Sequence, residues 1–239
     1  MERARDSMRL VVGRALPEAD IELLARRYLR LVRWQNEVRW HAKLCGPRPV
    51  EGLDRLTSLE GGALVHIVHH GPFLLIGPSL AQAGREVHVM ADPGLCAPDR
   101  LPWQAQSHAV ASRDCTLFSA EEGSAGIRER LASGLVVAVA TDVPGRTPVT
   151  FLGQQLVGSS GAVRAAYDVG APVVSATIHR DAKGSPGYRL SEPLDSGSFD
   201  SAESLLQELL RRQEEPVLAW PEAYYDPLTK WRLETPSMA

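Results

Sequence analysis

The feature that most constrains the fold is an alternation of short apolar runs with longer segments of helical periodicity. The apolar runs have the length of strands and lie at residues 63–68, 86–91, 135–141, 172–178 and 187–190. The helix candidates lie at residues 73–83, 121–133, 160–169 and 201–213. Short apolar strands that alternate with helices are typical of a mostly parallel sheet buried on both faces. The sequence therefore predicts an α/β fold with a mostly parallel (mixed) central sheet flanked by helices.

The chain, residues 1–239, is expected to form one domain. Its length, with 44% hydrophobic and 23% charged residues, suits a soluble protein with a substantial core. The stretch Gly46-Pro47-Arg48-Pro49 is predicted to be a stiff connection between an N-terminal helical segment, residues 1–45, and an α/β core, residues 60–232. Since the first residues are charged and no apolar run could span a bilayer, a cytoplasmic location is expected. Dispersed cysteines and histidines predict neither a disulfide framework nor a metal site.

Positive charge is concentrated near the N-terminus, although the net charge of the chain is −3. Residues 1–50 contain 11 Lys and Arg against 6 Asp and Glu, which leaves 15 against 23 for the remainder. Most of these basic residues fall on one predicted helix, about residues 17–43. Its basic faces are either a solvated surface or a contact for an acidic carrier protein, a phosphate-bearing co-substrate or the inner face of a membrane. Nucleic acid is not expected, because no binding motif accompanies the charge.

The strongest functional signal lies at residues 65–74, where an apolar strand runs into His69-His70-Gly71-Pro72 and a helix-like segment follows. A histidine at the exit of a strand, facing a helix N-terminus, would be kept neutral by the helix dipole and could act as a base. One of the two histidines could equally cap that helix. The local pattern supports catalysis and capping to the same extent.

A second group of polar residues follows the apolar run 135–141, at the sheet edge where α/β proteins usually bind ligands. Asp142 and Arg146 are predicted to orient a substrate or hold a phosphate, although a polar Pro-Gly turn explains them without a ligand. Ser159 and Ser160 precede a predicted helix, where exposed backbone N–H groups could bind an anion or an oxyanion. Simple serine capping explains the same residues and is favoured.

In their order along the chain, these segments resemble the bacterial lysophospholipid and lipid A biosynthesis acyltransferase family. That family has a histidine, then four residues, then an acid, and His69, Gly71 and Phe73 match its histidine, glycine and aromatic positions. The likeness continues downstream at Gly134–Asp142, Phe151–Gly153, Gly161–Val174 and Arg212–Trp220. It extends over roughly residues 15–232.

The resemblance implies a glycerolipid-acyltransferase-like fold and an acyltransferase activity. An acyl group would move from a coenzyme A or acyl carrier protein thioester, as co-substrate, to a hydroxyl or amine, with His69 as the general base. No bound cofactor or metal is implied. His70, Asp142, Arg146, Ser159 and Ser160 are the candidate substrate-binding residues. With an atypical motif and no N-terminal anchor predicted, a soluble biosynthetic intermediate is a better expected acceptor than a bulk lipid.

The motif departs from the family at Leu74, which stands where the acid is expected. Family members tend to carry an arginine near the active site, about thirteen residues before the glycine equivalent to Gly134. In this chain Glu121 stands at that position, and it is hypothesised to supply the carboxylate that Leu74 lacks. Acids are also favoured there by the helix dipole alone. Two alternatives remain: a non-catalytic relative that binds an acyl chain or carrier protein, and a ping-pong mechanism with Cys115 as nucleophile. Peptide-synthetase condensation enzymes also have adjacent histidines, but this chain is too short for their two-lobed fold.

Overall fold

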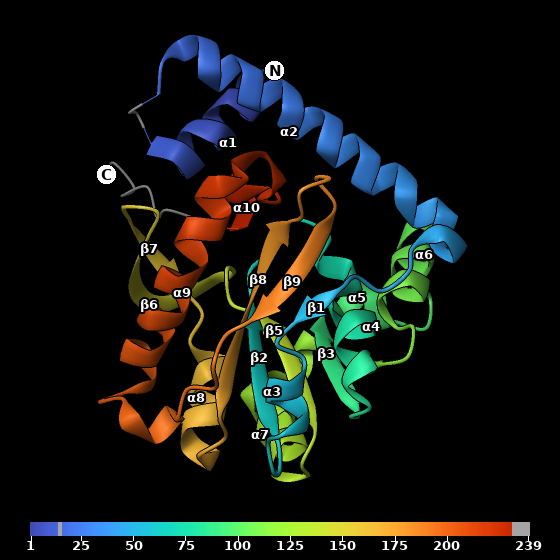
Figure 1. The fold of residues 1–239 in the computed structure, drawn as a ribbon, viewed down its shortest axis with the longest axis vertical. Helices are drawn as coiled ribbons and strands as arrows, with labels where there is room; N and C mark the ends of the chain where they lie inside the picture. Colours follow the sequence, from blue (N-terminus) through green and yellow to red (C-terminus); the bar gives the residue numbers. More distant parts are fainter. Residues whose placement is uncertain (14–15, 231–239) are drawn as a thin grey trace.

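The computed structural model describes residues 1–13 and 16–230, and within this range a central sheet of seven strands runs through the molecule (Figure 1). Its strand order is β1-β9-β8-β2-β5-β3-β4, and β6 and β7 form a separate hairpin. The strands are β1 (Val50–Glu51), β2 (Ala63–Ile67), β3 (Val87–Ala91), β4 (Thr116–Ser119), β5 (Val136–Ala140), β6 (Pro144–Phe151), β7 (Gln154–Gly158), β8 (Val173–Arg180) and β9 (Pro186–Leu190).

Five adjacent strands of the sheet, from β8 through β2, β5 and β3 to β4, run parallel to one another. Only the edge differs, because β9 is antiparallel to β8 and β1 pairs in parallel with β9. This arrangement confirms the predicted mostly parallel, mixed sheet. Strands β1, β4, β6 and β7 were not predicted from the sequence.

Helices cover both faces of the sheet. The α-helices are α1 (Glu2–Val12), α2 (Glu18–Val38), α3 (Asp54–Thr57), α4 (Ile76–Leu80), α5 (Pro93–Cys96), α6 (Pro102–Ala111), α7 (Gly123–Ala132), α8 (Gly161–Val169), α9 (Ala202–Ala219) and α10 (Pro227–Lys230). The 3₁₀ turns are η2 (Arg39–Leu44), η3 (Phe73–Leu75), η4 (Ala81–Ala83), η5 (Ala120–Glu122), η6 (Ser196–Ser198) and η7 (Pro221–Ala223).

The side chains of β2 show how the two cores are divided. Leu64 belongs to a large cluster that includes residues of α1, α2, α7, α8 and α9. Val65 belongs to a second cluster, with residues of α3 and α4. Successive side chains of a strand point to opposite faces, so an unbroken apolar run is what a strand covered on both sides requires.

Two predicted helices differ from the structure. The helix expected over residues 17–43 is α-helical only to Val38, and η2 follows with non-helical backbone at His41. The helix expected over residues 73–83 is broken into η3, α4 and η4. Pro78 explains the second difference, because it has no N–H to donate to the carbonyl of Leu74 in an α-helix.

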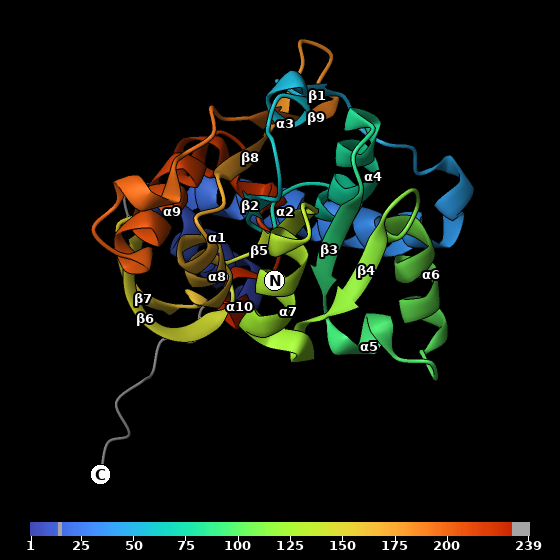
Figure 2. The ribbon, with the colours of Figure 1, turned by 90° about the horizontal axis from the view of Figure 1, so that it is seen from below.

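The N-terminal helices lie together at one end of the molecule, and α2 extends across it (Figure 1). The hairpin β6–β7 and helix α6 lie on opposite sides in both views (Figures 1 and 2). Within residues 1–13 and 16–230, no helix is both long and apolar enough to cross a membrane.

Candidate active site

The sheet register brings His69 and Asp142 together. In the parallel pair β2 and β5, Ile67 is the partner of Ala140, and the N–H of Thr141 donates to the carbonyl of Ile67 at 3.2 Å. Each of the two functional residues lies two positions beyond this last register pair. Because both strands end at the same edge of the sheet, their exits place the two side chains next to each other.

Asp142 holds His69 at two points. Nδ1 of His69 lies 2.7 Å from Oδ1 of Asp142, and the backbone N–H of His69 donates to Oδ2 at 3.0 Å. The aspartate side chain is fully buried, whereas the imidazole is 18% exposed. A carboxylate can only accept, so Nδ1 carries the proton and Nε2 of the neutral ring has a free lone pair. The same carboxylate would stabilise the imidazolium that forms when Nε2 takes up a proton.

The structure corrects the expected partner of His69, which is Asp142 and not Glu121. Glu121 is exposed in η5, where its backbone N–H donates to Oγ of Ser119 at 3.1 Å. No hydrogen bond between described residues joins it to His69. Its place in a first helical turn is accounted for by the helix dipole, the alternative that the sequence already offered.

Neither histidine of the pair caps a helix. Pro72 is the N-cap of η3 and Leu75 that of α4, and neither has a side-chain cap hydrogen bond. His70 is buried, with Nε2 2.9 Å from the carbonyl oxygen of Trp220, and burial lowers its pKa to about 4. The ring is therefore neutral and donates from Nε2. The structure gives His70 an anchoring contact with the chain after α9 and does not place it on the cavity described next.

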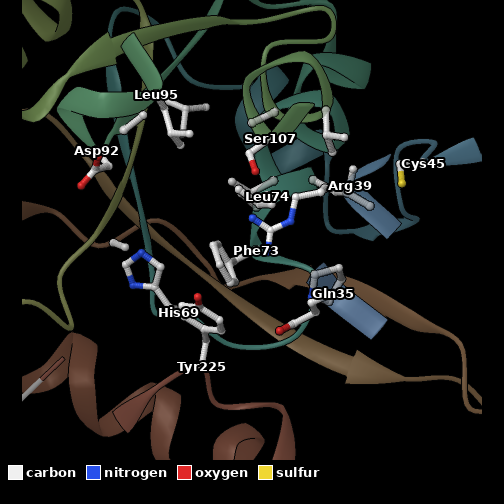
Figure 3. A pocket seen from close by; sticks show the side chains of 18 of the residues that line it. Gln35, Arg39, Cys45, His69, Phe73, Leu74, Asp92, Leu95, Ser107 and Tyr225 are labelled. Carbon is white, nitrogen blue, oxygen red and sulfur yellow. The ribbon is translucent and has the colours of Figure 1, made fainter. Parts of the chain in front are cut away.

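A cavity of about 450 Å³ opens beside His69. Its walls are mainly apolar and include Phe73, Leu75, Ile76, Val89, Leu95 and Val110. Leu74 also lines this space and packs against the cluster formed by Cys45, Leu75 and Val110. Figure 3 shows Phe73 between His69 and the side of the cavity where Leu74 lies. The position that carries the acid in the resembling family therefore contributes an apolar wall here.

The cavity also has polar groups at its two sides. Asp92, which caps α5 through a hydrogen bond from the N–H of Gly94 (2.9 Å), lies on the side of His69 (Figure 3). Gln35 and Arg39, from the end of α2 and the start of η2, lie on the other side (Figure 3). Gln35 also donates to the carbonyl of Gly71 at 3.0 Å, which ties α2 to the loop after β2.

The remaining predicted substrate-binding residues lie elsewhere. Arg146 is exposed on β6, and Oγ of Ser160 accepts a hydrogen bond from Oγ1 of Thr147 at 2.8 Å, next to the start of α8. Neither these two residues nor Ser159 line the cavity. Of the second polar group in the sequence, the structure brings only Asp142 to His69.

A buried polar network lies next to the His69–Asp142 pair, and no pattern in the sequence predicts it. Nε2 of His66 is 2.7 Å from Oγ1 of Thr141, and Nε2 of Gln213 donates to Oγ of Ser175 at 3.1 Å and lies 3.5 Å from Nδ1 of His66. Burial lowers the pKa of His66 to about 4, so the ring is neutral. The network joins α9 to the strands that carry the site. A lone glutamine in a helix gives no sequence signal for such a role.

Cys115 is poorly suited to act as a nucleophile. Burial raises the pKa of its thiol to about 11, and Sγ donates to the carbonyl of Ala111 at 3.0 Å. A thiol that is protonated and committed to a carbonyl is a weak nucleophile. Among the residues that the structure describes, no group of three or more His, Cys, Asp or Glu is placed to hold a metal ion.

Comparisons with known proteins give a likeness to solved structures and none at the level of sequence. No family model matches the chain, and no curated protein matches its sequence. Among solved structures, it is similar to the crystal structure of the 1-acyl-sn-glycerophosphate (LPA) acyltransferase PlsC from Thermotoga maritima. The identity is 15%, the match covers 90% of this chain and 95% of that one, and the TM-score is 0.48. A match at this level is a likeness of chain path and carries no inference about substrate or reaction.

Proposed function

We propose that this protein is an acyltransferase that moves an acyl group from a thioester to a hydroxyl or amine acceptor, with His69 as general base. The observation that carries the proposal is the His69–Asp142 pair, joined at 2.7 Å and placed beside an apolar cavity of about 450 Å³. A base oriented by a buried carboxylate is suited to proton transfer, and an apolar cavity is suited to a hydrocarbon chain.

The proposed reaction begins with the acceptor bound against Nε2 of His69. Nε2 takes the proton of the hydroxyl or amine while that atom attacks the thioester carbonyl, and a tetrahedral intermediate forms. Asp142 stabilises the resulting imidazolium through Nδ1. As the intermediate collapses, the C–S bond breaks and the imidazolium returns its proton to the leaving thiolate. The products are an ester or amide and a free thiol.

Direct transfer is favoured over a covalent acyl-enzyme. Ser107 lies in the cavity, but its Oγ donates to the carbonyl of Trp103 at 3.0 Å, and Figure 3 shows it on the far side of Phe73 from His69. Between described residues, the hydrogen bonds of the His69 ring go to Asp142 alone. A nucleophilic side chain activated by this histidine would need to be within hydrogen-bond reach of it.

Coenzyme A or an acyl carrier protein is the proposed donor, since both present an acyl thioester on a long flexible arm. The acceptor is proposed to be a small biosynthetic intermediate. Exposed apolar side chains occur on α2, on η2 and at the start of α6, namely Trp34, Trp40, Leu101 and Trp103, and α2 also carries the exposed Arg30 and Arg33. Trp34 and Trp103 line the cavity. Exposed apolar and basic side chains suit contact with an acidic carrier protein or with a membrane surface, and α2 belongs to the predicted basic helix.

The proposal is tested by intact-mass and coupled free-thiol assays with a panel of acyl-CoA and acyl-carrier donors against amine and alcohol acceptors. The His69→Ala variant is compared with wild type and with His108→Ala, which changes a histidine on α6 that does not line the cavity. We expect His69→Ala to lose at least about 10²-fold in turnover while His108→Ala keeps it. Equal turnover in His69→Ala would refute the proposal. Acyl binding without any turnover in wild type would instead favour the non-catalytic alternative.

A further inference from the structure

Two arginines line the mainly apolar cavity, and both come from the segment that connects α2 to the sheet. They are Arg39, the first residue of η2, and Arg48, two residues before β1. Neither forms an ion pair with a carboxylate among the described residues. Thirteen other arginines in that part of the chain do so: Arg3, Arg5, Arg9, Arg26, Arg27, Arg33, Arg55, Arg128, Arg130, Arg164, Arg189, Arg211 and Arg212.

Arg48 is held in place by its backbone. Its backbone N–H donates to Oγ of Ser79 at 2.9 Å, and its carbonyl accepts from Nε2 of Gln82 at 3.1 Å. The side chain, in contrast, has a buried Nε without a hydrogen-bond partner. A buried guanidinium nitrogen that is left unpaired costs free energy unless a ligand or solvent satisfies it.

Arg39 approaches the same space from the end of α2. Its Nε donates to the carbonyl of Asn36 at 3.0 Å, and its guanidinium lies over the ring of Trp103, 5.6 Å from the centroid. Figure 3 shows Arg39 and Cys45 on the side of the cavity away from His69, with Phe73 and Leu74 between. The negative groups, Asp142 and Asp92, lie on the side of His69. The positive charge of Arg39 therefore lies on the side of the cavity remote from the base, and Arg48 lines the same cavity.

We propose that Arg48, assisted by Arg39, forms an anion-binding subsite and that the acyl group transferred carries a carboxylate at the end remote from its thioester carbonyl. This inference rests on the proposed function. With the carbonyl at His69, the hydrocarbon part of such a group contacts the apolar walls and its terminal carboxylate meets the guanidinium groups. Planar guanidinium groups bind carboxylates through paired N–H donors, and a low-polarity cavity strengthens the interaction.

The orientation follows from the charges. A carboxylate on the side of His69 would face Asp92 and the buried charge of Asp142, and like charges at close range repel. The same carboxylate on the other side meets Arg39, and Arg48 lines the same cavity; neither arginine has an acidic partner in the described structure. A plain alkyl chain would leave the buried Nε of Arg48 unsatisfied.

The test uses a matched pair of donors, octanoyl-CoA and the mono-CoA thioester of octanedioic acid, which differ only in a terminal carboxylate. Wild type is compared with Arg48→Met and Arg48→Lys, and with Arg128→Met as a control on the exposed face of α7. We expect wild type to favour the carboxylated donor in kcat/KM by about 10- to 100-fold. Arg48→Met should abolish this preference, Arg48→Lys should keep part of it, and Arg128→Met should keep it in full.

A second measurement does not depend on turnover. Calorimetric titration with octanedioate and octanoate should show that wild type and Arg128→Met bind the dicarboxylate more tightly, and that Arg48→Met does not. If wild type binds octanedioate more tightly than octanoate but transfers neither acyl group, only the proposed function is overturned. Equal handling of both donors and both acids by wild type would overturn the anion subsite. If Arg48→Met instead changes the preference between β-alanine and propylamine as acceptors, the carboxylate belongs to the acceptor, and the assignment to the acyl group fails.

Discussion

Replacing Asp142 by Asn is the sharpest test of how His69 works. The substitution keeps the size of the side chain but removes its charge and half of its accepting capacity. In the structure both carboxylate oxygens are used, Oδ1 by Nδ1 of His69 and Oδ2 by the backbone N–H of the same residue. An amide has one oxygen, so it satisfies one of these donors and turns its NH₂ group toward the other.

The backbone N–H cannot change its role, so the amide oxygen is expected to accept from it. The NH₂ group then faces Nδ1, which must become an acceptor, and the proton of the neutral ring moves to Nε2. Such a ring cannot act as a base from Nε2. The variant also loses the attraction between carboxylate and imidazolium, which is about 4 kcal/mol for unit charges 4 Å apart at an effective dielectric constant of 20. In serine proteases the equivalent change lowers kcat about 10⁴-fold, or about 5 kcal/mol.

The expected result is a loss of about 10³- to 10⁴-fold in kcat for Asp142→Asn, with a folded protein by circular dichroism. ¹⁵N spectra of the imidazole groups, with His69→Ala used to assign the signal, should show the unprotonated nitrogen at Nε2 in wild type and at Nδ1 in the variant. This measurement needs no substrate. Glu121→Gln is the control and should change the rate less than 2-fold. The argument is refuted if Asp142→Asn keeps the wild-type tautomer or retains the rate within 10-fold.

Three further predictions follow from the same geometry. Leu74→Asp should not restore turnover to Asp142→Asn, because residue 74 lines the cavity. As a single variant, Leu74→Asp should weaken octanoate binding in calorimetry. Restored turnover in the double variant would contradict the placement of Leu74. His66 and His70 have folded pKa values of about 4, below the value of about 6.5 in the unfolded chain, so the unfolded state binds more protons between these limits and stability falls as the pH drops through the window. Urea titrations should show a loss of about 2 kcal/mol per histidine from pH 7 to pH 5, and a flat profile would speak against neutral buried rings. If α2 and η2 contact membranes, replacing Trp34 and Trp40, which are 43% and 53% exposed, by serine should reduce cosedimentation with anionic vesicles. Wild type that stays in the supernatant would exclude this contact.

The sheet could be predicted from the sequence because its central strands are buried on both faces. Runs such as residues 63–68 and 135–141 are apolar except for His66 and Thr141, and that pattern is visible without a structure. The strands at the edges of the sheet and in the hairpin were missed. They are less completely covered, so their sequences alternate between apolar and polar residues and contain no continuous apolar run. In β6, for example, Thr147, Val149 and Phe151 are buried, whereas Pro148, between the first two, is exposed.

For the site, the sequence identified both members of the pair but not their partnership. His69 was the expected base, whereas Asp142 was assigned to substrate binding and Glu121 to the support of His69. The information that joins His69 to Asp142 is the register of β2 against β5, a tertiary property. No counting along the chain supplies it. The cavity residues contributed by α2 and the segment after it were missed for the same reason.

The position of the carboxylate has a consequence for the rest of the site. A carboxylate at residue 74 would lie in the wall of the cavity. Asp142 is instead fixed by the sheet, through five consecutive register pairs from Ala63–Val136 to Ile67–Ala140 and through the contact of His66 with Thr141. The segment after His69 then has no carboxylate to position. It changes from η3 to α4 after Leu75, and Leu74 lines the cavity, so residue 74 supplies an apolar wall while Asp142 supplies the carboxylate.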